Sequence, residues 1–431
     1  MVTAVHKLQG AGGFGGADSY WIATAGTSDD EYGSGVSVMS DNSIAVVGFN
    51  NTTQDAYVLK YSTDGDVIWS KRFGTSGESL YQGRQVAVDS SDNIIVPLTS
   101  VTYGSANGDL AAVKYDTDGT LQWQKAWASS SIESCFGAAV SSTGNYYICG
   151  ETRVGGGNEN AILIFVDSSG LRYNTVCLQS SDSDYFDAVA VDSSDNAIVT
   201  GTTVNGAGFL NVLLAKYNSS GVLQWQRNLG SASFILWARC IAVDASDNIY
   251  IAGQSDVAFV AKYNSSGTLQ WFRKSSPTSM LYGITVDSSG NIYCAGYKAS
   301  PALGSAYTAL VIKYDNSGNI LWANEIGNSS AATYGRQIAL DQNENIILSA
   351  NTAAVGAGAQ DLMVAKLPSD GSGLGVYGGF TYRDATADLT PSAPSVTAQT
   401  ATLSEIFVSL TTYNTFFADG TATLTETLET I

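Results

Sequence analysis

The stretch KYNSSGVLQW at residues 216–225 decides the fold, because close copies of it recur along the chain. Three of the copies are KYDTDGTLQW at 114–123, KYNSSGTLQW at 262–271 and KYDNSGNILW at 313–322. Lys60 and Lys366 mark two more copies, and Phe165 marks a degenerate one. These marker residues stand 46 to 54 residues apart. Units of about 40–50 residues with four strands each are typical of propeller blades.

A second motif alternates with the first. It reads VAVDSSDNIIV at 86–96, VAVDSSDNAIV at 189–199, IAVDASDNIYIAG at 241–253, ITVDSSGNIYCAG at 284–296 and IALDQNENIIL at 338–348, with weaker copies at 36–48 and 138–150. Each unit therefore contains two hairpins. Seven such units predict an all-β protein, a seven-bladed β-propeller of four-stranded blades with a Thr/Ser/Ala-rich C-terminal extension.

The turn residues of the two hairpins predict backbone conformations. A glycine closes each turn of the second hairpin, where positive φ is needed and a Cβ atom would clash. These glycines are Gly65, Gly119, Gly170, Gly221, Gly267, Gly318 and Gly371. The first hairpin has Asp92, Asp195 or Asp247 at the matching position, or a glycine (Gly144, Gly290), and Asp tolerates the left-handed region better than most residues.

The tryptophans and lysines of the repeat are interpreted as packing residues. The tryptophans are predicted to lie between adjacent blades, and they are Trp69, Trp123, Trp225, Trp271 and Trp322. Each lysine is predicted to lie along its sheet with its ammonium group in water.

An extra tryptophan strand, SYWIATAG at 19–26, precedes the first unit. We expect residues 19–25 to close the last blade as its outer strand, because such a closure removes open sheet edges. This gives an N-terminal arm at 1–18, a propeller at 19–371, and a segment at 372–431 that serves attachment or oligomerisation. A flexible stalk is the alternative for that last segment, in which Arg383 is the only basic residue after position 372.

Composition limits the classes of partner. The net charge of −19 opposes binding to nucleic acid and to anionic membrane surfaces. No apolar run reaches the roughly 20 residues of a membrane span, so membrane insertion is not expected. The five cysteines are dispersed without metal-ligand spacing, which indicates free, buried thiols in a chain that folds in a cytosol.

The sequence contains no constellation typical of catalysis. His6 is the only histidine, which excludes Ser-His-Asp, Cys-His and histidine-metal sites within this sequence. The DSSDN turns offer oxygen ligands for calcium, but turn geometry explains every copy. We therefore predict no catalytic residue, no metal and no cofactor, and interpret the protein as a non-enzyme.

Departures from the repeat indicate the binding candidates. One position of each innermost strand varies, with Ser34, Arg84, Phe136, Asp187, Arg239, Tyr282 and Arg336 in the successive units. Arg84, Asp187, Arg239 and Arg336 are predicted to lie at the mouth of the central channel. They would there contact an anion, a glycan or a protein partner. The alternative is that each arginine packs on tyrosine and pairs with aspartate.

Residues 20–371 resemble seven-bladed propeller repeats of bacterial surface proteins and of virion proteins of tailed phages, especially marine cyanophages. The resemblance is carried by motifs such as ITVDSSGNIYCAG and AKYNSSGTLQW, and KLPSDGSGLGVYGGFTY at 366–382 is similar to the propeller-to-tail junction of phage members. It implies a structural or adhesive protein of a tail, fibre or capsid accessory, assembled in the host cytoplasm and located in the virion. Other virion subunits would bind through 372–431, a host surface glycan or protein is a further expected partner, and homo-oligomer formation stays open.

Other interpretations remain open. A glycan-degrading tail enzyme would release sugar from host polysaccharide. A bacterial surface propeller is a further alternative. A quinoprotein dehydrogenase also repeats tryptophan-bearing blades, but it would need a cofactor-stacking tryptophan and a calcium-binding acid set, and the sequence indicates neither.

Overall fold

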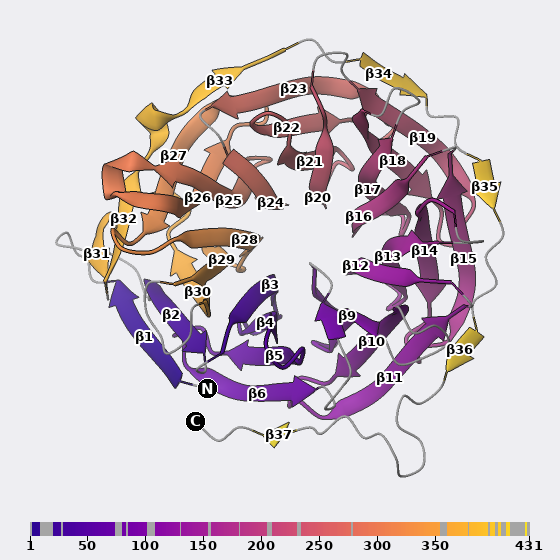
Figure 1. The fold of residues 1–431 in the computed structure, drawn as a ribbon, viewed down its shortest axis with the longest axis horizontal. Coiled ribbons are helices and arrows are strands. Elements are labelled where there is room, and N and C mark those ends of the chain that lie inside the picture. The colour runs from indigo at the N-terminus through magenta and orange to yellow at the C-terminus, as the bar shows by residue number, and fades with distance from the viewer. Residues whose placement is uncertain are drawn as a thin grey trace.

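The structure, a computed structural model, describes residues 2–8, 20–26, 29–73, 80–82, 85–100, 108–129, 131–153, 157–180, 182–204, 209–230, 234–276, 279–353, 360–377, 379–394, 397–400, 404–406, 411–413 and 427–428. Within these ranges the strands form seven sheets arranged around a common centre, as Figure 1 shows. The predicted seven-bladed β-propeller of four-stranded blades is confirmed.

Each blade is an antiparallel sheet whose first strand lies innermost. Blade 1 contains β3 (Glu31–Val38), β4 (Ile44–Asn50), β5 (Ala56–Tyr61) and β6 (Val67–Phe73). Blade 2 contains β7 (Leu80–Gln82), β8 (Ala87–Val88), β9 (Ile94–Ser100), β10 (Asp109–Tyr115) and β11 (Leu121–Ala128). Blade 3 contains β12 (Glu133–Val140), β13 (Tyr146–Thr152), β14 (Asn160–Val166) and β15 (Arg172–Gln179). Blade 4 contains β16 (Asp184–Val191), β17 (Ala197–Val204), β18 (Leu210–Tyr217) and β19 (Leu223–Gly230). Blade 5 contains β20 (Trp237–Val243), β21 (Ile249–Gln254), β22 (Ala258–Tyr263) and β23 (Leu269–Ser276). Blade 6 contains β24 (Ser279–Val286), β25 (Ile292–Ser300), β26 (Ser305–Tyr314) and β27 (Ile320–Gly327). Blade 7 contains β28 (Thr333–Leu340), β29 (Ile346–Thr352), β30 (Asp361–Leu367) and β2 (Tyr20–Gly26).

Short 3-10 turns are the only helical elements within the described residues, η2 (Pro301–Leu303) and η3 (Thr386–Asp388). None of these described helical segments has the length or apolarity to cross a membrane. All five cysteines are buried and free, as expected.

The hairpin turns have the predicted conformations. Gly119 has φ 78°, and the other six glycines at this position also have positive φ. Asp92, Asp195 and Asp247 have φ of 60–61°. Asp247 also links two blades, because its Oδ1 accepts the Ser193 backbone N–H at 2.9 Å.

The tryptophans pack between blades as predicted. The Trp69 indole of blade 1 lies against the turn of blade 2, where its N–H donates to the Thr117 carbonyl at 3.1 Å. A Cβ atom on Gly119 would lie 3.0 Å from this ring, so the ring would have to shift to admit a side chain, in addition to the strain set by positive φ. The same indole-to-carbonyl bond recurs at Trp123–Ser168, Trp271–Asn316 and Trp21–Thr63.

The prediction that the lysines place their ammonium groups in water is wrong. Lys114 is buried, and its Nζ lies 3.2 Å from the Asp89 carboxylate of the same blade. Lys216–Asp192 and Lys366–Asp341 repeat the pair at 2.6 and 2.9 Å. Burial alone would raise the pKa of Asp89, but hydrogen bonds led by those from Asn93 lower it. The aspartate of the first hairpin thus holds the lysine of the second.

The last blade contains one strand from the start of the chain. Residues 19–25 were expected there, and β2 pairs antiparallel with β30 along Trp21–Ala25. Trp21 is fully buried and donates its indole N–H to the Thr63 carbonyl of blade 1 at 3.0 Å. The two ends of the ring are therefore joined by main-chain and side-chain hydrogen bonds.

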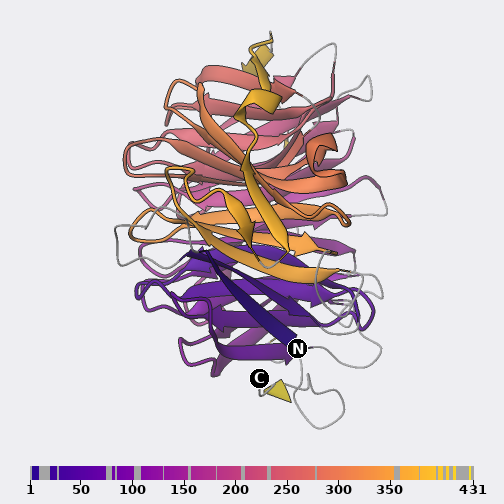
Figure 2. The ribbon, with the colours of Figure 1, turned by 90° about the vertical axis from the view of Figure 1, so that its left-hand side faces the viewer.

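The segment after the propeller follows the outer edges of the blades. Figure 1 shows it passing from blade 6 back toward blade 1, against the order of the blades. Figure 2 shows the first part of this segment lying across the outside of the ring. We call strands β31 to β37 the C-terminal belt. They are β31 (Gly375–Tyr377), β32 (Phe380–Asp384), β33 (Thr390–Ser392), β34 (Thr397–Thr400), β35 (Ser404–Ile406), β36 (Thr411–Tyr413) and β37 (Thr427–Leu428).

Each belt strand from β32 to β37 pairs antiparallel with the fourth strand of a blade. The partners are β27, β23, β19, β15, β11 and β6 in that order. In blade 7, β1 (Val2–Leu8) pairs with β2 in the same way. An uncovered edge strand presents unpaired N–H and C=O groups, so the belt and β1 cap every blade.

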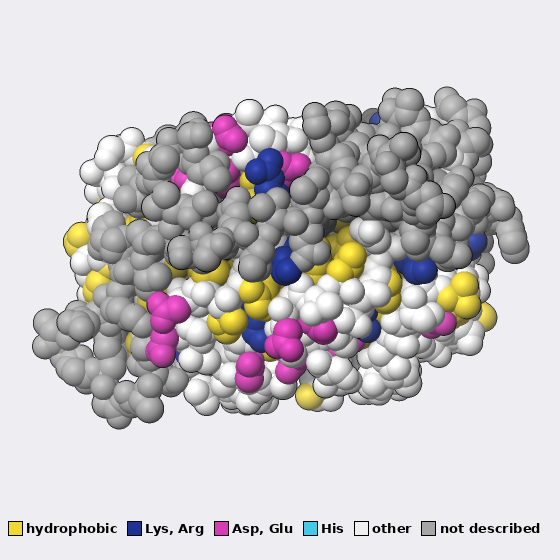
Figure 3. All heavy atoms as spheres, turned by 90° about the horizontal axis from the view of Figure 1, so that it is seen from below, with side chains coloured by type: hydrophobic (Ala, Val, Ile, Leu, Met, Phe, Trp, Pro, Cys, Tyr) yellow, Lys and Arg dark blue, Asp and Glu magenta, His cyan; other side chains and the backbone are white. Residues whose placement is uncertain are grey.

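The belt is fixed to blade 6 by charge and by apolar burial. Glu325 of β27 is fully buried, lies 3.3 Å from Lys298 Nζ and also pairs with Arg383 of β32. Phe380 and Tyr382 are buried in the core shared with blade 7. Figure 3 shows acidic and basic side chains interspersed among the described residues along one side of the ring.

Candidate binding site at the centre of the ring

The variable positions found in the sequence share a structural feature. Six of them interrupt the pairing register of the innermost strand, each as the extra residue of a β-bulge. These six are Ser34, Phe136, Asp187, Arg239, Tyr282 and Arg336. Bulges redirect a side chain and are frequent at functional sites. The seventh candidate, Arg84, lies outside the described residues.

A glycine on the second strand makes room for each bulge in five blades. A Cβ atom on Gly150 would lie 1.9 Å from the Ser134 carbonyl oxygen of the bulged strand. Gly201, Gly253 and Gly296 face the same restriction at 1.8–2.0 Å, and Gly48 faces it at 2.7 Å. The glycine that ends sequences such as YYICG and IYCAG is thus explained by close backbone approach.

Asp187 and Arg239 lie together and are buried. Arg239 of blade 5 donates through Nη1 to Asp187 Oδ1 of blade 4 at 3.2 Å, and Trp237 Nε1 donates to Asp187 Oδ2 at 3.0 Å. The Arg239 guanidinium also lies over the Trp237 ring. Both candidates are under 10% exposed. The two side chains therefore pair with each other, which is the packing alternative that the sequence left open.

Arg336 has a different environment. Its guanidinium centre lies 5.1 Å from the Tyr282 ring centroid and 5.8 Å from that of Tyr334, at distances typical of cation–π contacts. Tyr297 packs edge-on against Tyr334 and Tyr307 and also stacks on Tyr282, so it supports both rings. Among the described residues, none forms an ion pair or hydrogen bond with the Arg336 guanidinium.

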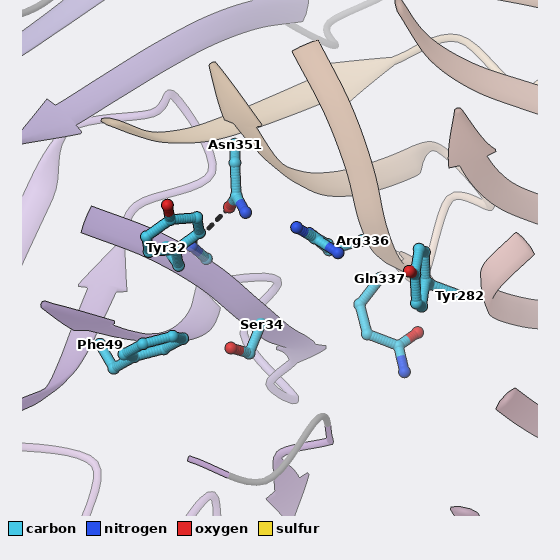
Figure 4. A pocket seen from close by; sticks show the side chains of 8 residues that line it. Tyr32, Ser34, Phe49, Tyr282, Arg336, Gln337 and Asn351 are labelled. Carbon is cyan, nitrogen blue, oxygen red and sulfur yellow. Dashed lines mark hydrogen bonds between the residues drawn. The ribbon is translucent and has the colours of Figure 1, made fainter. Parts of the chain in front are cut away.

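Arg336 lines a pocket of about 340 Å³ between blades 6, 7 and 1, which we call the central pocket. Its lining is Tyr32, Gly33, Ser34, Phe49, Tyr282, Arg336, Gln337 and Asn351. Figure 4 shows these side chains converging from β3, β24 and β28 and from the second strands of blades 1 and 7. Tyr32 and Phe49 stack at a centroid distance of 5.3 Å and form one aromatic wall.

The lining combines ring faces, hydrogen-bonding groups and one charge. Among the described residues that line the pocket, Arg336 is the only one whose side chain is ionised at neutral pH. Burial, and next the charge of Asp30, raises the pKa of Tyr32 above its ordinary value, so that phenol stays neutral. Such a pocket can bind a ligand with an anionic group and a flat apolar face, and none of its described lining residues carries a carboxylate, thiol or imidazole.

Two buried carboxylates lie beside the pocket rather than in it. Glu31 and Asp361 belong to neighbouring strands of blades 1 and 7, where the Glu31 N–H donates to the Gln360 carbonyl at 2.8 Å. Burial, followed by the charges of Glu31 and Asp30, raises the pKa of Asp361 to about 6. Asp361 is 1% exposed, so this carboxyl group affects the stability of the interface.

The sequence pattern marked Arg336, Ser34 and Tyr282 as variable positions but did not mark the other residues that line the pocket. Tyr32 and Tyr334 stand two positions before the bulge residue, and Phe49 and Asn351 follow the glycine or alanine of the facing strand. Their spacing from the bulge position repeats in every unit, so alignment of the seven units on the bulge would have identified them.

Comparison with known proteins gives distant likenesses. No protein-family description matches the chain. An uncharacterized WD repeat-containing protein of Acanthamoeba polyphaga mimivirus is 25% identical over 221 residues, which is 44% of this chain and 14% of the viral protein, so the chain spans a small part of that relative. Among solved structures, a protein of unknown function from Bacteroides caccae is 13% identical with a TM-score of 0.40, covering 68% of this chain and 93% of that one. The Dos1 propeller is 11% identical with a TM-score of 0.48, covering 78% and 77%. The seven-bladed architecture rests on the structure described above.

Proposed function

We propose that the chain is a non-enzymatic interaction module of a virus particle, with the propeller as a rigid carrier of the central pocket. The observation that carries this proposal is the pocket itself. Its described lining offers aromatic faces and one cation, Arg336, and these described residues include no acid–base pair or activated nucleophile of the kind that catalysis needs. In this function the pocket contacts a surface component of the host.

The rigidity of the ring supports the proposal. Indole-to-carbonyl bonds, buried lysine–aspartate pairs and turn-to-turn bonds such as Ser193–Asp247 repeat around it. A site held by packed, hydrogen-bonded neighbours keeps its geometry in the absence of ligand, which reduces the entropy lost on binding. A particle that must present a binding surface outside a cell benefits from such a carrier.

Residues 372–431 are proposed as the attachment segment. The belt strands lie at the outer edges of their sheets, and Thr390, Pro391 and Ser392 of β33 are exposed. A strand from a neighbouring virion subunit, or from a second copy, can add to such an edge by main-chain hydrogen bonding. The viral setting is supported by the repeat resemblance to tailed-phage virion proteins and by the distant likeness to the mimivirus WD repeat-containing protein.

The proposal is tested on virus particles that are released by a culture carrying the gene for this chain. Gradient-purified particles are analysed by mass spectrometry, and an antibody against the propeller is used for labelling in electron microscopy. We expect the chain in the particle fraction at a fixed stoichiometry. Its absence from particles would overturn the virion assignment. Sugar release from host polysaccharide by the purified chain would instead favour the glycan-degrading alternative.

A further inference from the structure

Asn351 leaves an unused donor in the central pocket. The side chain is fully buried, and its Oδ1 accepts the Gly33 backbone N–H at 2.7 Å. This bond fixes the orientation of the amide, because the backbone N–H can only donate. The Nδ2 group has no hydrogen-bond acceptor among the described residues. A buried donor without a partner is unfavourable, so the site is incomplete without an acceptor.

Arg336 supplies a second set of unused donors to the same space. Figure 4 shows the Asn351 amide and the Arg336 guanidinium pointing toward each other across the pocket. Tyr282 and Tyr334 attract the guanidinium through ring faces, and ring faces leave the N–H groups in the guanidinium plane available. Two donor groups of the same polarity therefore face one gap, and the group that completes them must be an acceptor with negative charge.

We propose that the central pocket binds the carboxylate of an acidic saccharide, with Asn351 Nδ2 and Arg336 as its donors. This inference rests on the proposed function, since it names the host component that the pocket contacts. A carboxylate is planar and accepts two parallel hydrogen bonds from a guanidinium, which matches the donors that Arg336 presents.

The remaining lining favours a sugar ring over a bare anion. The stacked pair of Tyr32 and Phe49 offers a flat apolar surface against which the C–H face of a pyranose can pack. The Ser34 hydroxyl and the Gln337 amide line the same pocket and can bond sugar hydroxyls. The volume of about 340 Å³ lies at the lower end of the range for small-molecule sites, which suits one ring and its substituents.

Isothermal titration of the full chain tests the ligand class with four probes. Glucuronate carries both ring and carboxylate, glucose only the ring, acetate only the carboxylate, and inorganic phosphate is a compact oxyanion. We expect glucuronate to bind at least about tenfold more tightly than each of the other three, because charge-assisted hydrogen bonds and ring packing both contribute. Equal binding of glucose, tighter binding of phosphate, or no binding of glucuronate would each overturn the proposal.

Two variants test the donors. Arg336→Met keeps the side-chain stem and removes the charge, and we expect its glucuronate affinity to fall about tenfold to a hundredfold. Asn351→Asp keeps the acceptor for the Gly33 N–H and places a carboxylate beside Arg336, as Asp187 does for Arg239. It should abolish glucuronate binding while raising the melting temperature, so that loss of binding cannot be attributed to unfolding.

The matched control is Arg153→Met, which removes one positive charge from an exposed arginine paired with Glu159 outside the pocket. Its affinity for glucuronate should stay within a factor of two of the parent chain. Retained binding in Asn351→Asp, or an equal loss in Arg153→Met, would refute the assignment of the donors. Particle labelling reports on the virion role separately, so the failure of one proposal leaves the other measurable.

Discussion

The interface between blades 7 and 1 contains a carboxyl group that should make stability depend on pH. Asp361 begins β30 and is 1% exposed, and neither of its carboxylate oxygens has a hydrogen-bond partner within the described ranges. Burial, and then the charges of Glu31 and Asp30, raises the pKa of Asp361 to about 6. The corresponding position is Asn160 in blade 3 and Asn211 in blade 4. Substitution of Asp361 by Asn therefore follows the repeat.

The size and sign of the effect follow from proton linkage. An aspartate in the unfolded chain has a pKa of about 3.9, so the folded chain holds this proton more tightly. The stabilisation from protonated Asp361 is fully present below about pH 4 and is lost as the pH rises through about 6. A difference of about two pKa units, at about 1.4 kcal/mol each, sets an upper limit near 3 kcal/mol at neutral pH. We expect Asp361→Asn to raise the free energy of unfolding by about 1–3 kcal/mol at pH 7 and to leave it unchanged near pH 4.

Guanidinium chloride denaturation of the parent and the variant at pH 4 and pH 7 measures this difference. The matched control is Asp55→Asn at the same strand position of blade 1, where the carboxylate accepts Arg72 Nε–H at 2.8 Å. That variant loses a hydrogen-bonded ion pair and should be less stable at pH 7, by on the order of 1 kcal/mol. If Asp361→Asn gains nothing at pH 7, or gains equally at both pH values, the linkage argument is wrong.

Three other predictions concern closure, the belt and its anchor. Trp21→Ala removes a fully buried indole from the closing strand, so denaturant titrations should show the free energy of unfolding lowered by about 3–5 kcal/mol. A loss below about 1 kcal/mol would mean that β2 contributes little to closure. Glu325→Gln removes the fully buried counter-charge of Lys298 and Arg383 and leaves them only the partly exposed Asp388, so trypsin should cleave after Arg383 faster than in the parent. An unchanged cleavage rate would contradict the anchoring role of Glu325. A chain truncated after residue 394 lacks β34 to β37 and should keep the circular dichroism spectrum of the parent. It should self-associate through the uncovered blade edges in analytical ultracentrifugation, and a strictly monomeric truncated chain would argue against edge protection.

The repeat was predictable because its residues satisfy local requirements. A glycine such as Gly119 is favoured by positive φ and by the close Trp69 ring, and both features recur at fixed spacing. The burial of Lys114 was not predictable in this way, since it depends on Asp89 in the other hairpin of the same blade. The belt was missed because its pairing joins distant residues, as in Thr397 opposite Gly230, and main-chain pairing leaves little trace in short Thr-rich sequence.

The candidate site was partly predictable for a related reason. A residue at a bulge is released from the packing that makes the other strand positions alike, so its variation along the chain was visible in the sequence. The partners of Arg336 were not visible, because Asn351 and Tyr32 become neighbours only through the register of two blades. Variation of the bulge residue between units thus located the site, but the residues around Arg336 could be identified only from the fold.

The different roles of Arg239 and Arg336 follow from the bulge residue of the preceding blade. Before Arg239 stands Asp187, whose carboxylate accepts the guanidinium N–H and neutralises its charge. Before Arg336 stands Tyr282, whose ring attracts the guanidinium over its face but accepts none of its in-plane N–H groups. The same residue type at the same position is therefore structural in one blade and available for a ligand in another. Exchange of one neighbour, as in Asn351→Asp, should convert the second state into the first.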